Sequence, residues 1–134
     1  MNISSYEELL AAARQQPEPQ RFLFVFTTAE LPEGYTKAQT ERFHAGQGGV
    51  LTPKICTDKA QDELGDFSDL VEESRQTGQD WKIVFVACLS GRGGVMPSTE
   101  EAQKPLKEMV ESIQNGAVSH FLAYDRDGNQ VQFS

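Results

Sequence analysis

The chain has 134 residues, of which 38% are hydrophobic and 24% are charged, a composition typical of one globular domain rather than a disordered chain. The formal net charge of −8 and the scattered positions of the 12 Lys and Arg residues argue against nucleic acid or an anionic membrane as partners. The sequence contains neither an apolar run near the ~20 residues that cross a bilayer nor a secretion signal, so we expect a single cytoplasmic domain over residues 1–134.

The first half of the sequence predicts alternating helices and strands. Ser5 and Glu8 stand at the spacing of a capping box, which opens a helix, and Pro17 ends that helix because proline cannot donate to the helical ladder. Pro53 lies within an apolar segment and is typical of an edge strand. The expected elements are a helix from Ser5, a strand over 21–28, a short helix over 36–45 and a strand over 50–57.

The second half centres on the continuous apolar run 83–88, which predicts a strand buried on both faces. Ser98 and Glu101 form another capping box at the start of a helix. Pro105 falls inside that helix at a cost of about 3 kcal/mol, which predicts either a kink or a main helix that starts at Pro105. The expected elements are helices over 66–77 and 98–114, and strands over 83–88, 118–124 and 130–133, the last two joined by the turn at Asp127-Gly128.

Helices that alternate with strands predict an α/β fold. We expect a three-layer sandwich in which helices cover both faces of a mostly parallel, mixed sheet of about five strands, with a C-terminal β-hairpin as its antiparallel part. The pattern leaves the strand order open between thioredoxin-like and flavodoxin-like windings. The terminal hairpin slightly favours the first, although the chain has no Cys-x-x-Cys pair.

The glycine-rich loop after the strand 83–88 is the candidate binding site. Glycines in such a loop allow backbone amides to converge on an anion, and the following helix N-terminus favours negative charge. The loop matches neither a Walker A sequence nor the dinucleotide fingerprint, because Val95 and Met96 follow its glycines. The alternative is a tight connection whose glycines serve backbone geometry. The candidate anion-binding residues are Ser90, Gly91, Arg92, Gly93, Gly94, Ser98 and Thr99.

The two cysteines, Cys56 and Cys88, fall in predicted strands. They are too few for a disulfide scaffold and lack the paired spacing of a metal site. We therefore expect both to be reduced thiols in the core.

No catalytic or metal-binding constellation emerges from the sequence. If their strands are parallel, Cys88 and His120 lie roughly 10 Å or more apart, so a Cys–His dyad requires antiparallel strands. A triad of Ser90, His120 and Asp125 has no nucleophile elbow. The acidic turn 125–129 lacks the glycine and glutamate positions of a calcium loop. We expect no catalytic residue, no metal and no cofactor, and whether the protein is an enzyme stays open.

Several segments of the chain carry a resemblance to known proteins: RFLFVF at 21–26, CTDKA at 56–60, EESR at 72–75, IVFVA at 83–87, LSGRGG at 89–94 and the turn at 125–128. Through these segments, and over nearly its full length, the chain resembles a family of small proteobacterial proteins. Members of this family often carry the label "ribonucleotide reductase subunit alpha", which implies a large radical enzyme with several active-site cysteines. A chain of 134 residues whose only cysteines are Cys56 and Cys88 cannot house that machinery, so the resemblance implies at most a nucleotide-related ligand and no functional residues.

Two functions are consistent with these observations. The favoured one is a non-catalytic binding or adaptor domain that contacts a protein or a small ligand through the loops beyond the strand ends. The alternative is a small enzyme or ligand-binding protein for a phosphorylated or nucleotide-like anion, held by Arg92 and the backbone amides of residues 91–94. The expected partner is thus either a protein or a small anionic ligand.

Overall fold

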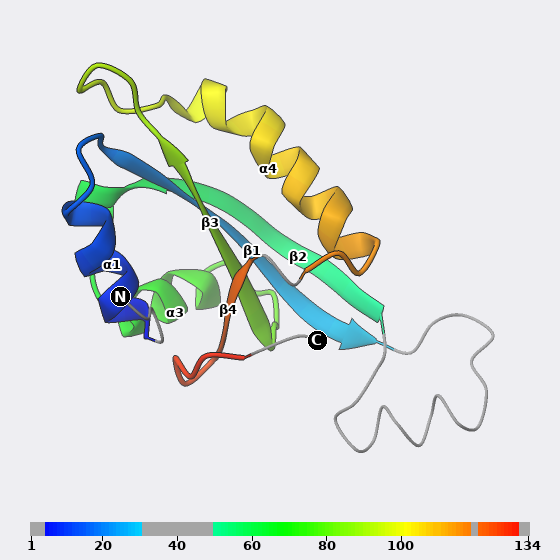
Figure 1. The fold of residues 1–134 in the computed structure, drawn as a ribbon. Coiled ribbons are helices and arrows are strands. Elements are labelled where there is room, and N and C mark those ends of the chain that lie inside the picture. Colours follow the sequence, from blue (N-terminus) through cyan, green and yellow to red (C-terminus); the bar gives the residue numbers. More distant parts are fainter. Residues whose placement is uncertain (1–4, 31–49, 119–120, 132–134) are drawn as a thin grey trace.

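The computed structural model of the protein describes residues 5–30, 50–118 and 121–131. Its centre is a four-stranded sheet in the order β2-β1-β3-β4, in which every neighbouring pair is antiparallel (Figure 1). Among the helices of the described residues, none combines the length and the apolar character that a membrane span needs. The elements are α1 (Tyr6–Arg14), β1 (Gln20–Glu30), β2 (Val50–Ala60), the 3-10 helix η1 (Gln61–Glu63), α3 (Phe67–Arg75), β3 (Ile83–Ser90), α4 (Thr99–Gln114) and β4 (Leu122–Asp125).

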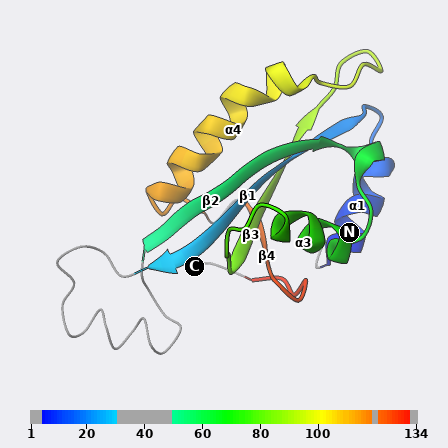
Figure 2. The same ribbon diagram turned by 180° about the vertical axis from the view of Figure 1, so that it is seen from behind.

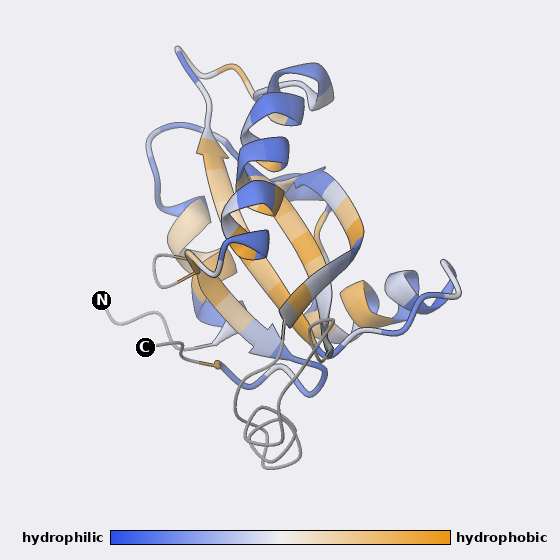
Figure 3. Cartoon of the chain, turned by 90° about the vertical axis from the view of Figure 1, so that its right-hand side faces the viewer, coloured by the Kyte–Doolittle hydropathy of each residue, from blue (hydrophilic) through white to orange (hydrophobic). Residues whose placement is uncertain are grey.

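Helices cover both faces of the sheet, with α1 and α3 on one face and α4 on the other (Figures 1 and 2). Because successive side chains of a strand point to opposite faces, β1 supplies a core to each side. Phe22 and Phe24 pack with α1 and α3, whereas Leu23 and Val25 pack against α4. Figure 3 shows the hydrophobic strands behind α4, whose outward face is hydrophilic.

The helices begin where the capping signals place them. Ser5 accepts a hydrogen bond from the Glu8 amide at 3.1 Å, and Ser98 accepts one from the Glu101 amide at 3.0 Å. Each bond satisfies an amide that has no partner within its helix. Helix α4 runs from Thr99 to Gln114 through Pro105, so the expectation of a main helix that starts at Pro105 is wrong.

The expected mostly parallel sheet of about five strands is wrong, because the structure is an α+β arrangement with a four-stranded, wholly antiparallel sheet. Strands β2 and β3 are both antiparallel to β1 and therefore run in the same direction, as a strand–helix–strand crossover requires. However, β1 lies between them, so no parallel pair forms. The alternation of elements along the sequence carries no information about this insertion.

The C-terminal hairpin is shorter than expected. The turn is present, since the Asp125 carboxylate accepts hydrogen bonds from the amides of Asp127 and Asn129. Beyond it, the described residues form one bridge, between Tyr124 and Gln130, so no fifth strand is seen at 130–131. Residues 132–133 of that expected strand, and the helix expected over 36–45, lie outside the described residues.

Candidate functional site

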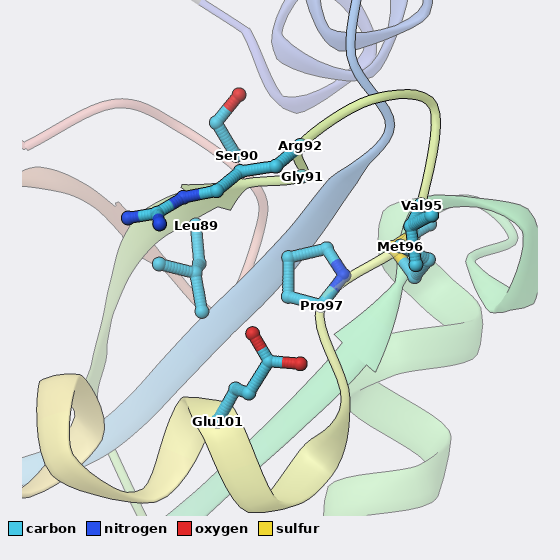
Figure 4. Close-up of a pocket in the computed structure, with 8 residues that line it drawn as sticks. All are labelled: Leu89, Ser90, Gly91, Arg92, Val95, Met96, Pro97 and Glu101. Carbon is cyan, nitrogen blue, oxygen red and sulfur yellow. The ribbon is translucent and has the colours of Figure 1, made fainter.

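The glycine-rich loop and the start of α4 border a hollow at one end of the sheet (Figure 4). Its volume of about 380 Å³ lies in the range of roughly 300–1,000 Å³ that is usual for small-molecule sites. Of the seven candidate residues, it brings together three: Ser90, Gly91 and Arg92. The full lining is Leu89, Ser90, Gly91, Arg92, Val95, Met96, Pro97 and Glu101.

Gly93 and Gly94 form the tip of the loop and do not line the hollow. Arg92 and Val95 on either side exchange two backbone hydrogen bonds, of 3.2 and 3.0 Å. The φ angles of Gly93 and Gly94 are +59° and +80°, the values of a two-residue hairpin turn that glycine adopts without steric cost. These two glycines are therefore explained by the backbone conformation of the turn.

The loop amides donate hydrogen bonds inside the protein. The Gly91 amide donates to the Pro19 carbonyl at 2.8 Å, and the Gly94 amide lies 3.0 and 3.2 Å from the two carboxylate oxygens of Glu18. A Cβ atom on Gly91 would clash with the Val95 carbonyl oxygen. The segment before β1 thus packs closely on the loop, and the Glu18 carboxylate accepts the hydrogen bond that the Gly94 amide could otherwise donate to a ligand.

Two side chains of opposite charge line the hollow. The Arg92 guanidinium extends above Leu89 (Figure 4), is exposed, and makes no hydrogen bond or ion pair with any residue that the structure describes. The Glu101 carboxylate rises from the first turn of α4 toward Leu89 and Pro97 (Figure 4). Its Oε1 accepts from the Ser98 amide at 3.4 Å and hydroxyl at 3.3 Å, and its Oε2 has no partner within the described part of the chain.

The remaining candidates, Ser98 and Thr99, have structural partners. Ser98 caps α4, and the Thr99 hydroxyl accepts from Arg21 Nη2 at 3.0 Å and donates to Asp58 Oδ2 at 2.9 Å. Arg21 is only 9% exposed, and its Nε lies 3.3 Å from the same carboxylate oxygen. This partly buried network joins β1, β2 and α4. The sequence gives no local signal for it, because Thr99 is 78 positions from Arg21 and 41 from Asp58.

The possible nucleophiles do not form a catalytic arrangement among the described residues. Ser90 accepts a hydrogen bond from Gln20 Nε2 at 2.9 Å. Asp125 pairs with Ile83, which lies at the opposite end of β3 from Ser90. At ~3.3 Å per residue the two ends of β3 are roughly 23 Å apart, so Ser90 and Asp125 cannot belong to one Ser-His-Asp arrangement. No group of three or more potential metal-binding side chains occurs in the described ranges.

Cys56 and Cys88 are free and exposed, so the expectation of core thiols is wrong. Cys88 borders a shallow apolar hollow beside Leu9 and Ala13 of α1, and the resulting partial desolvation raises the pKa of its thiol to about 11. A thiol with such a pKa is a poor nucleophile at neutral pH. β3 and β4 are antiparallel, as a dyad with His120 would require, but His120 lies outside the described residues.

Comparison with known proteins adds no relative to this picture. No family model, no curated protein and no solved structure matches the chain. The resemblance to the small proteobacterial family therefore stays a prediction, and function has to be argued from the hollow and its lining residues.

Proposed function

We propose that the protein is a non-catalytic binding domain that takes part of a partner molecule into the hollow between the loop and α4. The observation that carries this proposal is Arg92, whose guanidinium has no partner within the described residues and stands on the wall of a ligand-sized hollow. Arginine presents a planar set of donors that suits carboxylates, and it is enriched at binding surfaces. A cytoplasmic location belongs to the same proposal.

Val95 supports a role in recognition. It is 68% exposed, which makes it the large hydrophobic side chain with the greatest exposure among the described residues. The turn that pairs Val95 with Arg92 holds both side chains on a pre-formed backbone. A partner would therefore order little of the loop on binding, which reduces the entropic cost of association. An apolar side chain beside an arginine is suited to anchoring a protein segment.

A phosphorylated or nucleotide-like anion is the second candidate, and the same unpaired Arg92 supports it. The amides of Gly91 and Gly94 donate elsewhere, so they are not available to cradle a phosphate. Glu101 on the opposite wall would repel a multiply charged anion. These contacts make the anion the weaker of the two candidates.

A selection experiment tests the site. Phage-displayed random peptides are selected on the immobilised full chain, and nucleotides and inorganic phosphate are screened in parallel by thermal shift. We expect the selected ligands to lose affinity by roughly tenfold in Arg92→Ala, the effect of losing one charged hydrogen-bonding group, and to retain part of it in Arg92→Lys.

The matched control is Arg75→Ala, which removes another exposed arginine, one whose ion pair among the described residues is with Glu72 at 3.7 Å. Ligands that bind Arg92→Ala and Arg75→Ala with equal affinity would place recognition outside the hollow and contradict the proposal. Peptides that are enriched while nucleotides and phosphate show no shift would reject the second candidate.

A further inference from the structure

The facing walls of the hollow carry unlike charges that do not neutralise each other. Arg92 stands on the loop wall and Glu101 on the helix wall, with Leu89 and Pro97 between them (Figure 4). No ion pair joins the two side chains, although the chain forms such pairs elsewhere, as between Arg126 and Asp80 at 3.0 Å. Both groups are therefore available to a molecule that enters the hollow.

We infer that the hollow selects a small zwitterion of the α-amino acid class. The ligand carboxylate would accept hydrogen bonds from the Arg92 guanidinium, whose planar fork matches carboxylate geometry. Its ammonium group would donate to Glu101 Oε2, the oxygen that the capping box leaves without a partner among the described residues. This assignment rests on the proposed function and names the chemistry that the same site recognises.

The other lining side chains indicate what the zwitterion carries. Leu89, Val95, Met96 and Pro97 are apolar, so burial against them favours an apolar side chain on the ligand. A volume of about 380 Å³ accommodates an amino acid of the size of leucine. The same pair of charges occurs on a free amino acid and on the two ends of a very short peptide.

Three related molecules separate the contributions of the two charges. L-leucine has both groups, 4-methylpentanoate lacks the ammonium, and 3-methylbutylamine lacks the carboxylate. In NMR titrations of the full chain, we expect leucine to bind about two- to fivefold more tightly than either single-charge analogue, because each exposed charged contact adds a modest increment. The dipeptide Leu-Leu, titrated in the same way, distinguishes a peptide from a free amino acid as the source of the charges.

The variants Glu101→Gln and Arg92→Ala assign each charge to its wall. Glutamine can replace glutamate in a capping box, so Glu101→Gln preserves the start of α4, which an unchanged melting temperature verifies. We expect Glu101→Gln to abolish the higher affinity of leucine relative to 4-methylpentanoate without weakening the binding of 4-methylpentanoate. Arg92→Ala should weaken the binding of both ligands by about two- to fivefold.

The outcomes separate this inference from the proposed function. If 4-methylpentanoate binds as tightly as leucine and Glu101→Gln changes the affinity of neither ligand, the assignment of a zwitterionic ligand is wrong, while the hollow remains a binding site. If none of these four probes changes the NMR signals of the residues that line the hollow, but the affinity of the selected peptides still depends on Arg92, only the inference is contradicted. If neither the probes nor any selected peptide depends on Arg92, the inference and the proposed function fall together.

Discussion

Arg21 and Arg92 lie near the same end of the sheet but in opposite situations. Arg21, opposite Leu89 in the β1–β3 register, is buried and contacts Asp58 and Thr99. Arg92 is exposed, and its guanidinium contacts no partner within the described residues. A charge removed from water needs compensating partners, so Arg21 holds elements together. A solvated charge needs none, so Arg92 remains free to bind a ligand.

The largest expected effect on stability comes from replacing Arg21, the buried one of the two arginines. Arg21→Ala leaves the Asp58 carboxylate without its charge partner, and we expect a loss of about 3–5 kcal/mol in the free energy of unfolding. Arg92→Ala should change it by less than about 0.5 kcal/mol, because it removes only a solvated side chain. Urea denaturation of both variants measures the difference, and equal losses would contradict the distinct roles of the two arginines.

Gly91→Ala should have the next largest effect. Its added Cβ atom clashes with the Val95 carbonyl oxygen and approaches Pro19, so we expect destabilisation of about 1–3 kcal/mol, as for other overpacked sites. Gly78→Ala is the contrasting control: no atom lies within 4 Å of its added group, so its cost comes from the φ of +74°, which is unfavourable for alanine, whereas the φ of Gly91 is not in the positive range. A melting temperature of Gly91→Ala equal to that of the wild type would show that close packing on the loop is unimportant.

Arg126 is an intermediate case between the two arginines. It donates to Asp80 at 3.0 Å and to the Trp81 carbonyl at 3.1 Å, and its guanidinium lies 5.0 Å from the centroid of the Trp81 ring. We expect Arg126→Ala to cost about 1 kcal/mol, because the contacts are only partly desolvated. Arg126→Lys, which keeps the charge but loses the planar fork, should recover only part of this stability in thermal unfolding.

The smallest expected effect concerns Tyr6, whose ring is buried and whose hydroxyl has no hydrogen-bond partner within the described residues. Desolvation, followed by nearby Tyr124 and acidic groups, raises the pKa of the phenol. A raised pKa means that the folded protein holds the proton more tightly, so stability falls as pH rises above the unfolded value of about 10. Tyr6→Phe should be neutral or slightly stabilising at pH 7 and should show a shallower loss above pH 10 in chemical denaturation.

A steeper alkaline loss in Tyr6→Phe than in the wild type would contradict this account of the Tyr6 environment. Tyr124→Phe serves as the comparison, because burial also raises the pKa of the Tyr124 phenol, to about 12, and its hydroxyl too lacks a partner within the described ranges. Both variants should therefore change the alkaline slope in the same direction.

Local signals in the sequence predicted the starts of α1, α3 and α4 and the positions of β1, β2 and β3, because capping residues and apolar runs act over a few neighbouring positions. They did not predict that β4 is limited to Leu122–Asp125 or that no fifth strand is seen at 130–131. The strand directions could not be predicted, because the position of β1 between β2 and β3 depends on pairing between distant segments. For the candidate site, the sequence singled out Ser90, Gly91 and Arg92, which the structure shows lining the hollow. The sequence could not indicate that Glu18, which is 76 positions from Gly94, accepts a hydrogen bond from the Gly94 amide, or that Glu101 faces the same hollow.

The central position of β1 also has a consequence for synthesis. Of the described strands it emerges first from the ribosome, yet it ends in the middle of the sheet, with β2 along one edge and β3 along the other. Until residue 90 has been made, this strongly apolar segment lacks its full set of neighbours and exposes pairing groups on which other nascent chains can dock. Aggregation during slow translation should therefore begin at the segment that is best protected in the finished molecule.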